Sequence, residues 1–371
     1  MIKILSIFGT RPEAIKMAPV VKCLDAAPGI DSLVCVTAQH RTMLDQVLTL
    51  FDIHPDVDLN IMKANQDLAH ITTEVLNGVG KVLDDIQPDR ILVHGDTTTT
   101  FAASLAAYYR QIPVGHVEAG LRTGNPYAPF PEEINRKLTD GIADLCFAPT
   151  NSAKENLLRE NIPDHQIHVT GNTVIDALHH IVQDLKNDSS IPLSFPFLNE
   201  SQRLILVTGH RRENFGAGFE NICTALLELS KRDDIQIVYP VHLNPNIREP
   251  VERLLKEKSN IHLIDPLDYA PFVYLMEKAD IVITDSGGIQ EEAPSLGKPV
   301  LVIRDVTERP EAVEAGTVKL VGTDATVITE TALNLIDDEK SYATMSKAHN
   351  PYGDGKASPR IRDVILKQHG A

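Results

Sequence analysis

Two acidic residues each follow a run of apolar residues in the first third of the chain. Asp96 ends the run in ILVHGD, and Glu118 directly follows VGHV. Such runs predict buried strands of a parallel sheet, whose carboxyl ends share the edge at which open α/β folds bind ligands. We therefore expect both carboxylates to lie at a ligand site, where they could accept and donate protons.

Two basic residues occupy a similar position near the N-terminus. In FGTRPEAIKMAP, Gly9 and Thr10 follow the first predicted strand, and Arg11 and Lys16 open the first predicted helix. Solvation at the surface is the usual fate of such side chains. A strand-to-helix turn that carries two cations in an acidic protein is better explained by an anionic ligand, such as one that bears phosphate.

A glycine-containing turn in the second half has the features of a phosphate site. DIVITDSGGIQEE passes from a predicted strand through Ser286, Gly287 and Gly288 into a helix. Glycines allow backbone N–H groups to approach an anion, and a helix N-terminus carries partial positive charge. Glu292 follows one turn later, where it could accept hydrogen bonds from ribose hydroxyls. The alternative is a plain strand-to-helix turn.

Two further segments contain chemically useful groups. Glu132 and Glu133 open a predicted helix in PFPEEINRKLTD, and His210 directly follows a strand in VTGHRREN. An acid in the first turn of a helix also stabilises the helix dipole, so Glu132 has a purely structural alternative. His210 is the stronger candidate, because loops at strand ends in this architecture hold ligands.

His94 and His116 precede Asp96 and Glu118 by two residues and therefore share a strand face with them. Packing or orienting roles suit these histidines as well as catalytic ones.

The elements that position these residues follow an alternating pattern. Short runs rich in Val, Ile and Leu alternate with helical patterns up to about residue 170, and again from residue 203 onward. This order is typical of βαβ units with parallel sheets. A polar, proline-bearing stretch at residues 186–202 interrupts it and predicts an interdomain linker. We expect two doubly wound halves, with the carboxyl edges of both sheets lining a shared cleft.

Composition limits the partners. The chain has 371 residues with 51 acidic against 35 basic side chains, a formal charge of −16. This balance disfavours nucleic acid and anionic membranes as partners. The four cysteines are widely spaced in apolar surroundings, which favours buried free thiols and a cytoplasmic location. The first residues are apolar for too short a run to form a signal sequence.

The sequence predicts no cofactor. No G-x-G-x-x-G motif follows a predicted strand, so a tightly bound nicotinamide is not expected. The D-x-D at residues 56–58 lies beside a proline and reads as a turn, and no group of His, Cys and Asp has the spacing of metal ligands. We therefore expect no essential metal.

Eight segments together resemble one enzyme family. They are GTRPEAIKMAP, TAQHRTMLDQ, HGDTTTT, VEAGLRTG, PEEINR, GHRREN, TDSGGIQEEAPSLGKPVLV and RDVTERPEA. In this order they resemble the non-hydrolysing UDP-N-acetylglucosamine 2-epimerases of bacteria over nearly the whole chain. The resemblance implies a glycosyltransferase-B fold of two Rossmann-like domains facing across a cleft: residues 1–172 together with a C-terminal helix at 355–371, and residues 173–354. It also implies a homodimer.

The resemblance implies roles for individual residues. The catalytic set comprises Asp96, Glu118, Glu132 and His210. The positions around the nucleotide sugar comprise Arg11, Lys16, Phe272, Ser286, Gly287, Gly288, Glu292 and Arg309. Some bacterial members are activated by their own substrate at a second site, which here matches Gln39, His40 and His242. Because Asn65 stands where activated members can carry arginine, this regulation is expected to be weaker or differently built, and a strand-end cap is the alternative for Gln39 and His40.

The implied reaction interconverts UDP-N-acetylglucosamine and UDP-N-acetylmannosamine, which supplies a sugar for surface polysaccharide. The C2 proton has no adjacent carbonyl to acidify it, so elimination of UDP to a 2-acetamidoglucal and re-addition is the expected route. Two faces of C2 require at least two acid–base groups. Three alternatives remain at this point: a hydrolysing epimerase that releases free N-acetylmannosamine, a glycosyltransferase of the same fold, and a nucleotide-sugar sensor.

Overall fold

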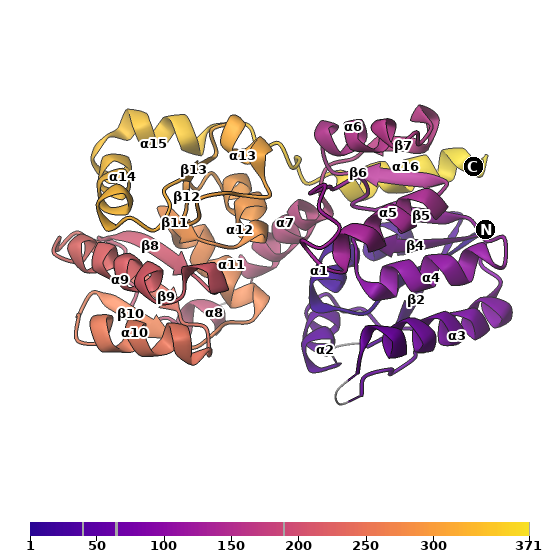
Figure 1. Ribbon diagram of the computed structural model, residues 1–371, viewed down its shortest axis with the longest axis horizontal. Coiled ribbons are helices and arrows are strands. Elements are labelled where there is room, and N and C mark those ends of the chain that lie inside the picture. The colour runs from indigo at the N-terminus through magenta and orange to yellow at the C-terminus, as the bar shows by residue number, and fades with distance from the viewer. Residues whose placement is uncertain (39–40, 64–65, 188–189, 371) are drawn as a thin grey trace. The chain divides into compact units, whose positions relative to one another are not determined.

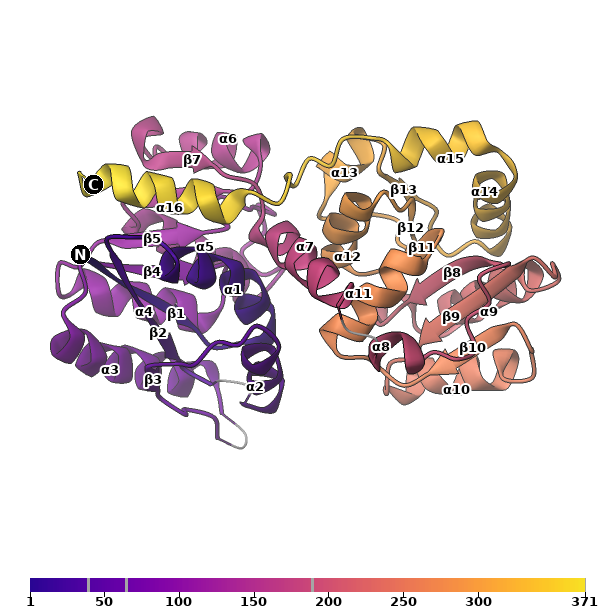
Figure 2. The ribbon, with the colours of Figure 1, turned by 180° about the vertical axis from the view of Figure 1, so that it is seen from behind.

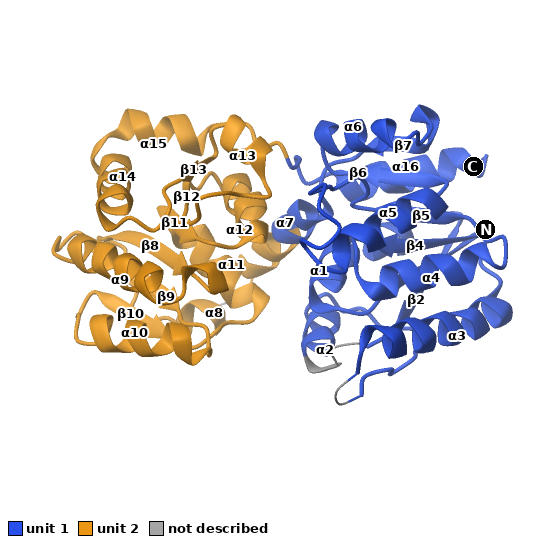
Figure 3. Ribbon diagram, in the orientation of Figure 1, with its two compact units in different colours: residues 1–179, 352–371 blue, residues 180–351 orange. Residues whose placement is uncertain are grey.

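The computed structural model describes residues 1–38, 41–63, 66–187 and 190–370. The chain divides into two compact units. Unit 1 comprises Met1–His179 and Tyr352–Ala371, and unit 2 comprises His180–Pro351 (Figure 3). The chain first passes between the units inside one helix, α7 (Thr173–Leu185). The boundary predicted after residue 172 therefore falls at the start of this helix, whereas the units divide within it.

Unit 1 is built on a parallel sheet of seven strands in the order β3-β2-β1-β4-β5-β6-β7. Figure 1 labels β2, β4, β5, β6 and β7 of this sheet. This is the strand order of a Rossmann fold with one strand added. The strands are β1 (Ile2–Phe8), β2 (Ile30–Val36), β3 (Val57–Asp58), β4 (Arg90–His94), β5 (Val114–Val117), β6 (Leu145–Ala148) and β7 (Ile167–Val169).

Helices cover both faces of this sheet. They are α1 (Arg11–Asp25), α2 (Arg41–Leu50), α3 (Leu68–Ile86), α4 (Thr98–Tyr108), α5 (Glu132–Ile142), α6 (Asn151–Arg159), the short 3₁₀ turn η1 (Asp164–Gln166) and α16 (Ala357–Gln368). The last of these, α16, lies beside α1, where Arg362 Nη1 approaches Cys23 Sγ at 3.8 Å (Figure 2). The C-terminal helix thus belongs to the unit that the N-terminus begins.

Unit 2 repeats the design with six parallel strands in the order β10-β9-β8-β11-β12-β13. The strands are β8 (Arg203–Thr208), β9 (Ile235–Pro240), β10 (Ile261–Ile264), β11 (Ile281–Thr284), β12 (Val300–Val302) and β13 (Val318–Leu320). The helices are α8 (Ser190–Leu193), η2 (Arg212–Asn214), α9 (Ala217–Leu229), α10 (Pro245–Leu255), α11 (Tyr269–Lys278), α12 (Gly287–Glu292), η3 (Ala293–Leu296), α13 (Pro310–Glu314), α14 (Ala325–Asp337) and α15 (Glu339–Ser346).

The central strands are buried along their whole length because helices cover both faces, which explains their unbroken apolar sequences. Each unit has its own apolar core, formed between sheet and helices. The strand-to-helix turns at the carboxyl edges are the places where polar side chains follow at once, so each sheet presents its candidate residues there.

The prediction of an interdomain linker at residues 186–202 is wrong. Its described part lies within unit 2. Phe195 is buried and stacks on Tyr274 with ring centroids 5.8 Å apart, and Gln236 Nε2 donates to the carbonyl of Asn199 at 2.6 Å. Polar composition and prolines suggested a free segment, but two phenylalanines in the stretch give it apolar anchors.

Among the described residues, no helix has both the length and the apolar character needed to cross a bilayer. The expected free thiols are confirmed: Cys35, Cys146 and Cys223 are buried and unpaired, and Cys23 is half-buried.

Candidate active site

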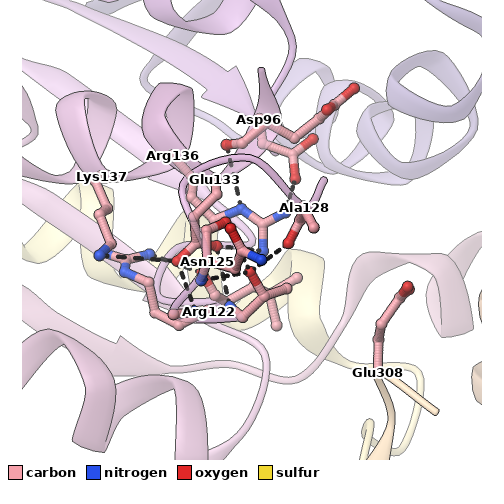
Figure 4. Close-up of polar contacts among 12 residues, drawn as sticks. Asp96, Arg122, Asn125, Ala128, Glu133, Arg136, Lys137 and Glu308 are labelled. Carbon is pink, nitrogen blue, oxygen red and sulfur yellow. Dashed lines mark hydrogen bonds and ion pairs between the residues drawn. The ribbon is translucent and has the colours of Figure 1, made fainter. Parts of the chain in front are cut away.

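Asp96 lies in the turn between β4 and α4, at the carboxyl edge of the unit 1 sheet. Thr97 caps α4 by accepting the N–H of Thr100 at 3.1 Å, which fixes the turn. The Asp96 carboxylate forms an ion pair with Arg136 of α5, with Oδ2 2.8 Å from Nη2 (Figure 4). Burial raises the pKa of Asp96 above its usual range, Arg136 opposes the rise, and the charges of Glu118 and Glu132 add to it.

Glu118 lies in the equivalent turn after β5, with a left-handed φ of 68°. Glu118 Oε1 accepts hydrogen bonds from Lys16 Nζ and, at 2.9 Å, from Asn172 Nδ2. Only 9% of the side chain is exposed. A non-glycine residue in this conformation is strained, so the turn holds the carboxylate in place at a cost in backbone energy. Sequence position alone gave no sign that Lys16 and Glu118 pair.

His94 stands beside Glu118 rather than at a surface. Its Nε2 lies 3.6 Å from Glu118 Oε2, and neither ring nitrogen has a hydrogen-bond partner. Burial lowers the pKa of His94 to about 3, against the opposing effect of Glu118, so the ring is neutral at pH 7. A neutral ring keeps the carboxylate of Glu118 in a poorly solvated pocket without neutralising it.

The two glutamates that open α5 divide their roles. Glu133 is buried, and its carboxylate accepts the N–H groups of Thr123 and Gly124 at 3.0 Å each. It therefore holds the loop before the helix. Glu132 is only half-buried, and its charge acts on Asp96. Of this pair, Glu133 holds the loop, and Glu132 is the one whose charge raises the pKa of Asp96.

Glu13 ties two of these turns together and was not singled out from the sequence. Its Oε2 accepts the N–H groups of Gly9 and Thr10, and its Oε1 accepts the hydroxyl of Thr97 at 2.6 Å. The signal was present as a capping box, Thr10 with Glu13 three residues later, at the start of α1. The turn of Arg11 is thereby fixed to the turn of Asp96, and Arg11 itself makes no ion pair with the described residues.

In unit 2, Asp285 organises the loop of His210. Its Oδ2 accepts the N–H groups of His210 and Arg211 at 2.8 Å each, and His210 Nδ1 lies 3.2 Å from Oδ1. Although burial works in the opposite direction, these bonds lower the pKa of Asp285. The His210 side chain is 46% exposed although its Nδ1 faces Asp285, which suits a group that meets a ligand.

The predicted phosphate turn begins α12, and Ser286 is its N-cap with no side-chain bond of its own to the helix. Arg309 approaches this turn: a Cβ on Gly287 would stand 3.8 Å from the guanidinium. Arg309 Nε also donates to Glu291 Oε1. Gly288 lies beside Glu292, which accepts the hydroxyl of Tyr269 at 2.9 Å.

The remaining predicted residues are placed differently. Phe272 is half-buried on α11, three residues after Tyr269. His242 stacks near His210 with ring centroids 6.1 Å apart, so a residue predicted for regulation neighbours one predicted for catalysis. Gln39, His40 and Asn65 lie outside the described residues. Within the described ranges there is no group of three or more His, Cys, Asp or Glu side chains that could hold a metal ion.

Comparison with known proteins identifies the family. A family model described as UDP-N-acetylglucosamine 2-epimerase matches residues 22–366. The chain belongs to the UDP-N-acetylglucosamine 2-epimerase family. A probable UDP-N-acetylglucosamine 2-epimerase of Ralstonia solanacearum is 61% identical over 98% of this chain and 99% of the relative. A UDP-N-acetylglucosamine 2-epimerase of Salmonella typhimurium is 60% identical over 98% of each chain.

A solved structure of the family has the same fold. The crystal structure of UDP-GlcNAc 2-epimerase from Neisseria meningitidis bound to UDP-GlcNAc is 56% identical, covers 99% of this chain and 100% of its own, and superposes with a TM-score of 0.89. The predicted family and the predicted fold class, two Rossmann-like units of the glycosyltransferase-B kind, are therefore confirmed.

Proposed function

We propose that this protein catalyses the reversible, non-hydrolysing epimerisation of UDP-N-acetylglucosamine at C2 to UDP-N-acetylmannosamine. The observation that carries the proposal is the contrast between two acids at one sheet edge. Burial raises the pKa of Asp96, whereas Glu118 is bonded to Lys16. Neighbouring carboxyl groups in unlike environments are the usual basis for separate acid and base roles.

The proposed chemistry is an elimination followed by a re-addition. A carboxylate takes the C2 proton while the C1–O bond to UDP breaks, with the electron pair leaving on the UDP oxygen. UDP then re-adds at C1, and C2 receives a proton on the opposite face. No redox step is required. Asp96, Glu118 and Glu132 provide the acid–base groups.

The UDP leaving group calls for stabilisation of negative charge, which we assign to Arg11, Lys16, His210 and Arg309 with the Ser286–Gly288 turn. In unit 2, the exposed His210 ring and the Arg309 guanidinium beside Gly287 support this assignment. We assign Glu292 to the ribose, and Phe272 to the wall of the same site. The relative from N. meningitidis is described as bound to UDP-GlcNAc, which agrees with this class of substrate.

We also propose a cytoplasmic homodimer. The dimer follows from the family resemblance, and the four free cysteines suit a reducing compartment. Light scattering coupled to size-exclusion chromatography measures the dimer directly, and a monomer mass at micromolar concentration would contradict it.

The deciding experiment is NMR of the purified protein with UDP-N-acetylglucosamine in D₂O, without acceptor, nicotinamide or added metal. Deuterium at C2 together with UDP-N-acetylmannosamine at equilibrium is the expected result. Free N-acetylmannosamine with UDP would instead establish hydrolysis. An unchanged substrate would contradict epimerisation and favour a transferase or a sensor.

A further inference from the structure

His116 is a fully buried residue of β5 that the proposed reaction does not use. Its Nε2 lies 2.7 Å from the carbonyl oxygen of Gly95, and its Nδ1 lies 2.6 Å from Asp140 Oδ1. Gly95 immediately precedes Asp96 and has a left-handed φ of 69°. The ring therefore reaches from the centre of one strand to the turn that presents the proposed catalytic acid on the neighbouring strand.

Asp140 extends this contact to a second turn. Its Oδ2 accepts the N–H of Gly120 at 3.3 Å and Arg122 Nη2 at 2.7 Å. Gly120 stands two residues after Glu118. One buried pair, His116 with Asp140, thus contacts both turns that carry the proposed catalytic carboxylates.

The proton positions follow from the partners. A carbonyl oxygen only accepts, so Nε2 must donate to Gly95. Asp140 receives two other N–H donors on Oδ2, which suits an ionised carboxylate. Burial acts to raise the pKa of Asp140, but His116 and Arg122 lower it, in agreement with this state. Each ring nitrogen of this buried side chain therefore has a polar partner, which burial of a polar group requires.

We infer that His116, held by Asp140, is a positioning residue that fixes the Gly95 carbonyl and thereby the placement of Asp96 for proton transfer at C2. The inference rests on the proposed function. A small displacement of a reacting group costs much rate, on the order of 100-fold for about 1 Å. The contact therefore acts on kcat and leaves nucleotide binding to other residues.

Two substitutions of His116 separate its contact with Gly95 from its contact with Asp140. The amide nitrogen of glutamine can take the place of Nε2, so His116→Gln retains a donor to Gly95 and loses the bond to Asp140. The shorter asparagine places its amide near Nδ1, so His116→Asn retains a bond to Asp140 and loses Gly95. His168→Asn on β7 is a matched control, because the ring of that histidine packs against Phe147 with ring centroids 6.1 Å apart.

The assay measures kcat and KM for the epimerisation, UDP affinity by calorimetry and unfolding by urea. His116→Asn should lower kcat about 100-fold at unchanged KM and UDP affinity. His116→Gln should keep most of the wild-type kcat, although both His116 variants should lose a similar amount of stability. His168→Asn should keep the full wild-type kcat. Equal losses of kcat in the Gln and Asn variants, or no loss in either, would overturn the inference.

Neutron diffraction of the wild-type protein tests the inference even if the variants do not fold. Hydrogen on Nε2 of His116, directed at the Gly95 carbonyl, is expected, and an Nε2 without hydrogen would overturn the inference. Absence of epimerisation by the wild type would count against the proposed function instead, and the protonation of His116 would still be decided by this measurement.

Discussion

Units 1 and 2 share one sheet order but hold their candidate residues in different ways. At the edge of the unit 1 sheet, basic side chains pair with the two candidate carboxylates: Arg136 pairs with Asp96, and Lys16 pairs with Glu118. At the edge of the unit 2 sheet, Asp285 accepts the backbone N–H groups of His210 and Arg211, and the His210 side chain stays 46% exposed. On the proposed function, this scaffold carries the acid–base groups in unit 1 and part of the site for UDP in unit 2. On the proposed function, substitutions at Asp96 and Arg136 of unit 1 should lower turnover, and a substitution at Gly287 of unit 2 should weaken UDP binding.

Asp96→Asn should have the largest effect on turnover. An amide cannot take up the C2 proton, so we expect kcat to fall by about 1,000-fold or more while UDP affinity stays at the wild-type value. Initial rates by NMR and UDP calorimetry measure both. Asp85→Asn, on the exposed side of α3, is the control and should match the wild type. Retained activity in the Asp96 variant would contradict its assignment.

Arg136→Met should give the next largest effect, about 10- to 100-fold in kcat. Arg136 works against the rise in the pKa of Asp96, so its removal should raise that pKa further and move the Asp96 limb of the pH–rate profile to higher pH. Arg159→Met on α6, which removes an exposed cation, should leave the profile in place. A limb that moves to lower pH, or does not move, would show that Arg136 does not tune Asp96.

Gly287→Ala tests the proposed phosphate turn of unit 2. A Cβ there meets only Arg309, at an ordinary 3.8 Å, so folding should be unaffected. The methyl group should crowd an approaching phosphate and weaken UDP binding about tenfold, or about 1.4 kcal/mol. Calorimetry with UDP gives the affinity. Gly141→Ala, where a Cβ meets nothing within 4 Å, should bind UDP normally. Unchanged affinity in the Gly287 variant would argue against a phosphate at this turn.

His94→Gln should have the smallest effect, a change in how the free energy of unfolding depends on pH. The folded-state pKa of His94 is about 3, below its ordinary value of 6.5, so the unfolded chain binds the proton first as pH falls. The stability linked to His94 is present above pH 6.5 and is lost below it, by about 1.4 kcal/mol per pH unit. Urea unfolding at pH 7, 6 and 5 should show that the free energy of unfolding falls more steeply with decreasing pH in the wild type than in the His94 variant. Parallel losses would mean that His94 is protonated in the native state.

The sequence predicted the fold class, because buried parallel strands leave unbroken apolar runs that end in small and polar residues. It also predicted which turns bear polar groups. The pairing between them was not predictable: Arg136 and Asp96 are 40 residues apart, and nothing in either segment indicates that α5 brings them together. Likewise, composition marked residues 186–202 as a linker, but whether Phe195 finds a partner depends on tertiary packing.

The backbone of Glu118 has a consequence for engineering. A left-handed residue with a side chain costs about 1–3 kcal/mol, which glycine in the same place would not incur. A library selected for heat resistance alone would therefore be drawn to glycine at this position and would discard the carboxylate. On the proposed function, selection for a more stable enzyme has to keep residue 118 constant, because the residue that relieves the backbone strain there cannot transfer a proton.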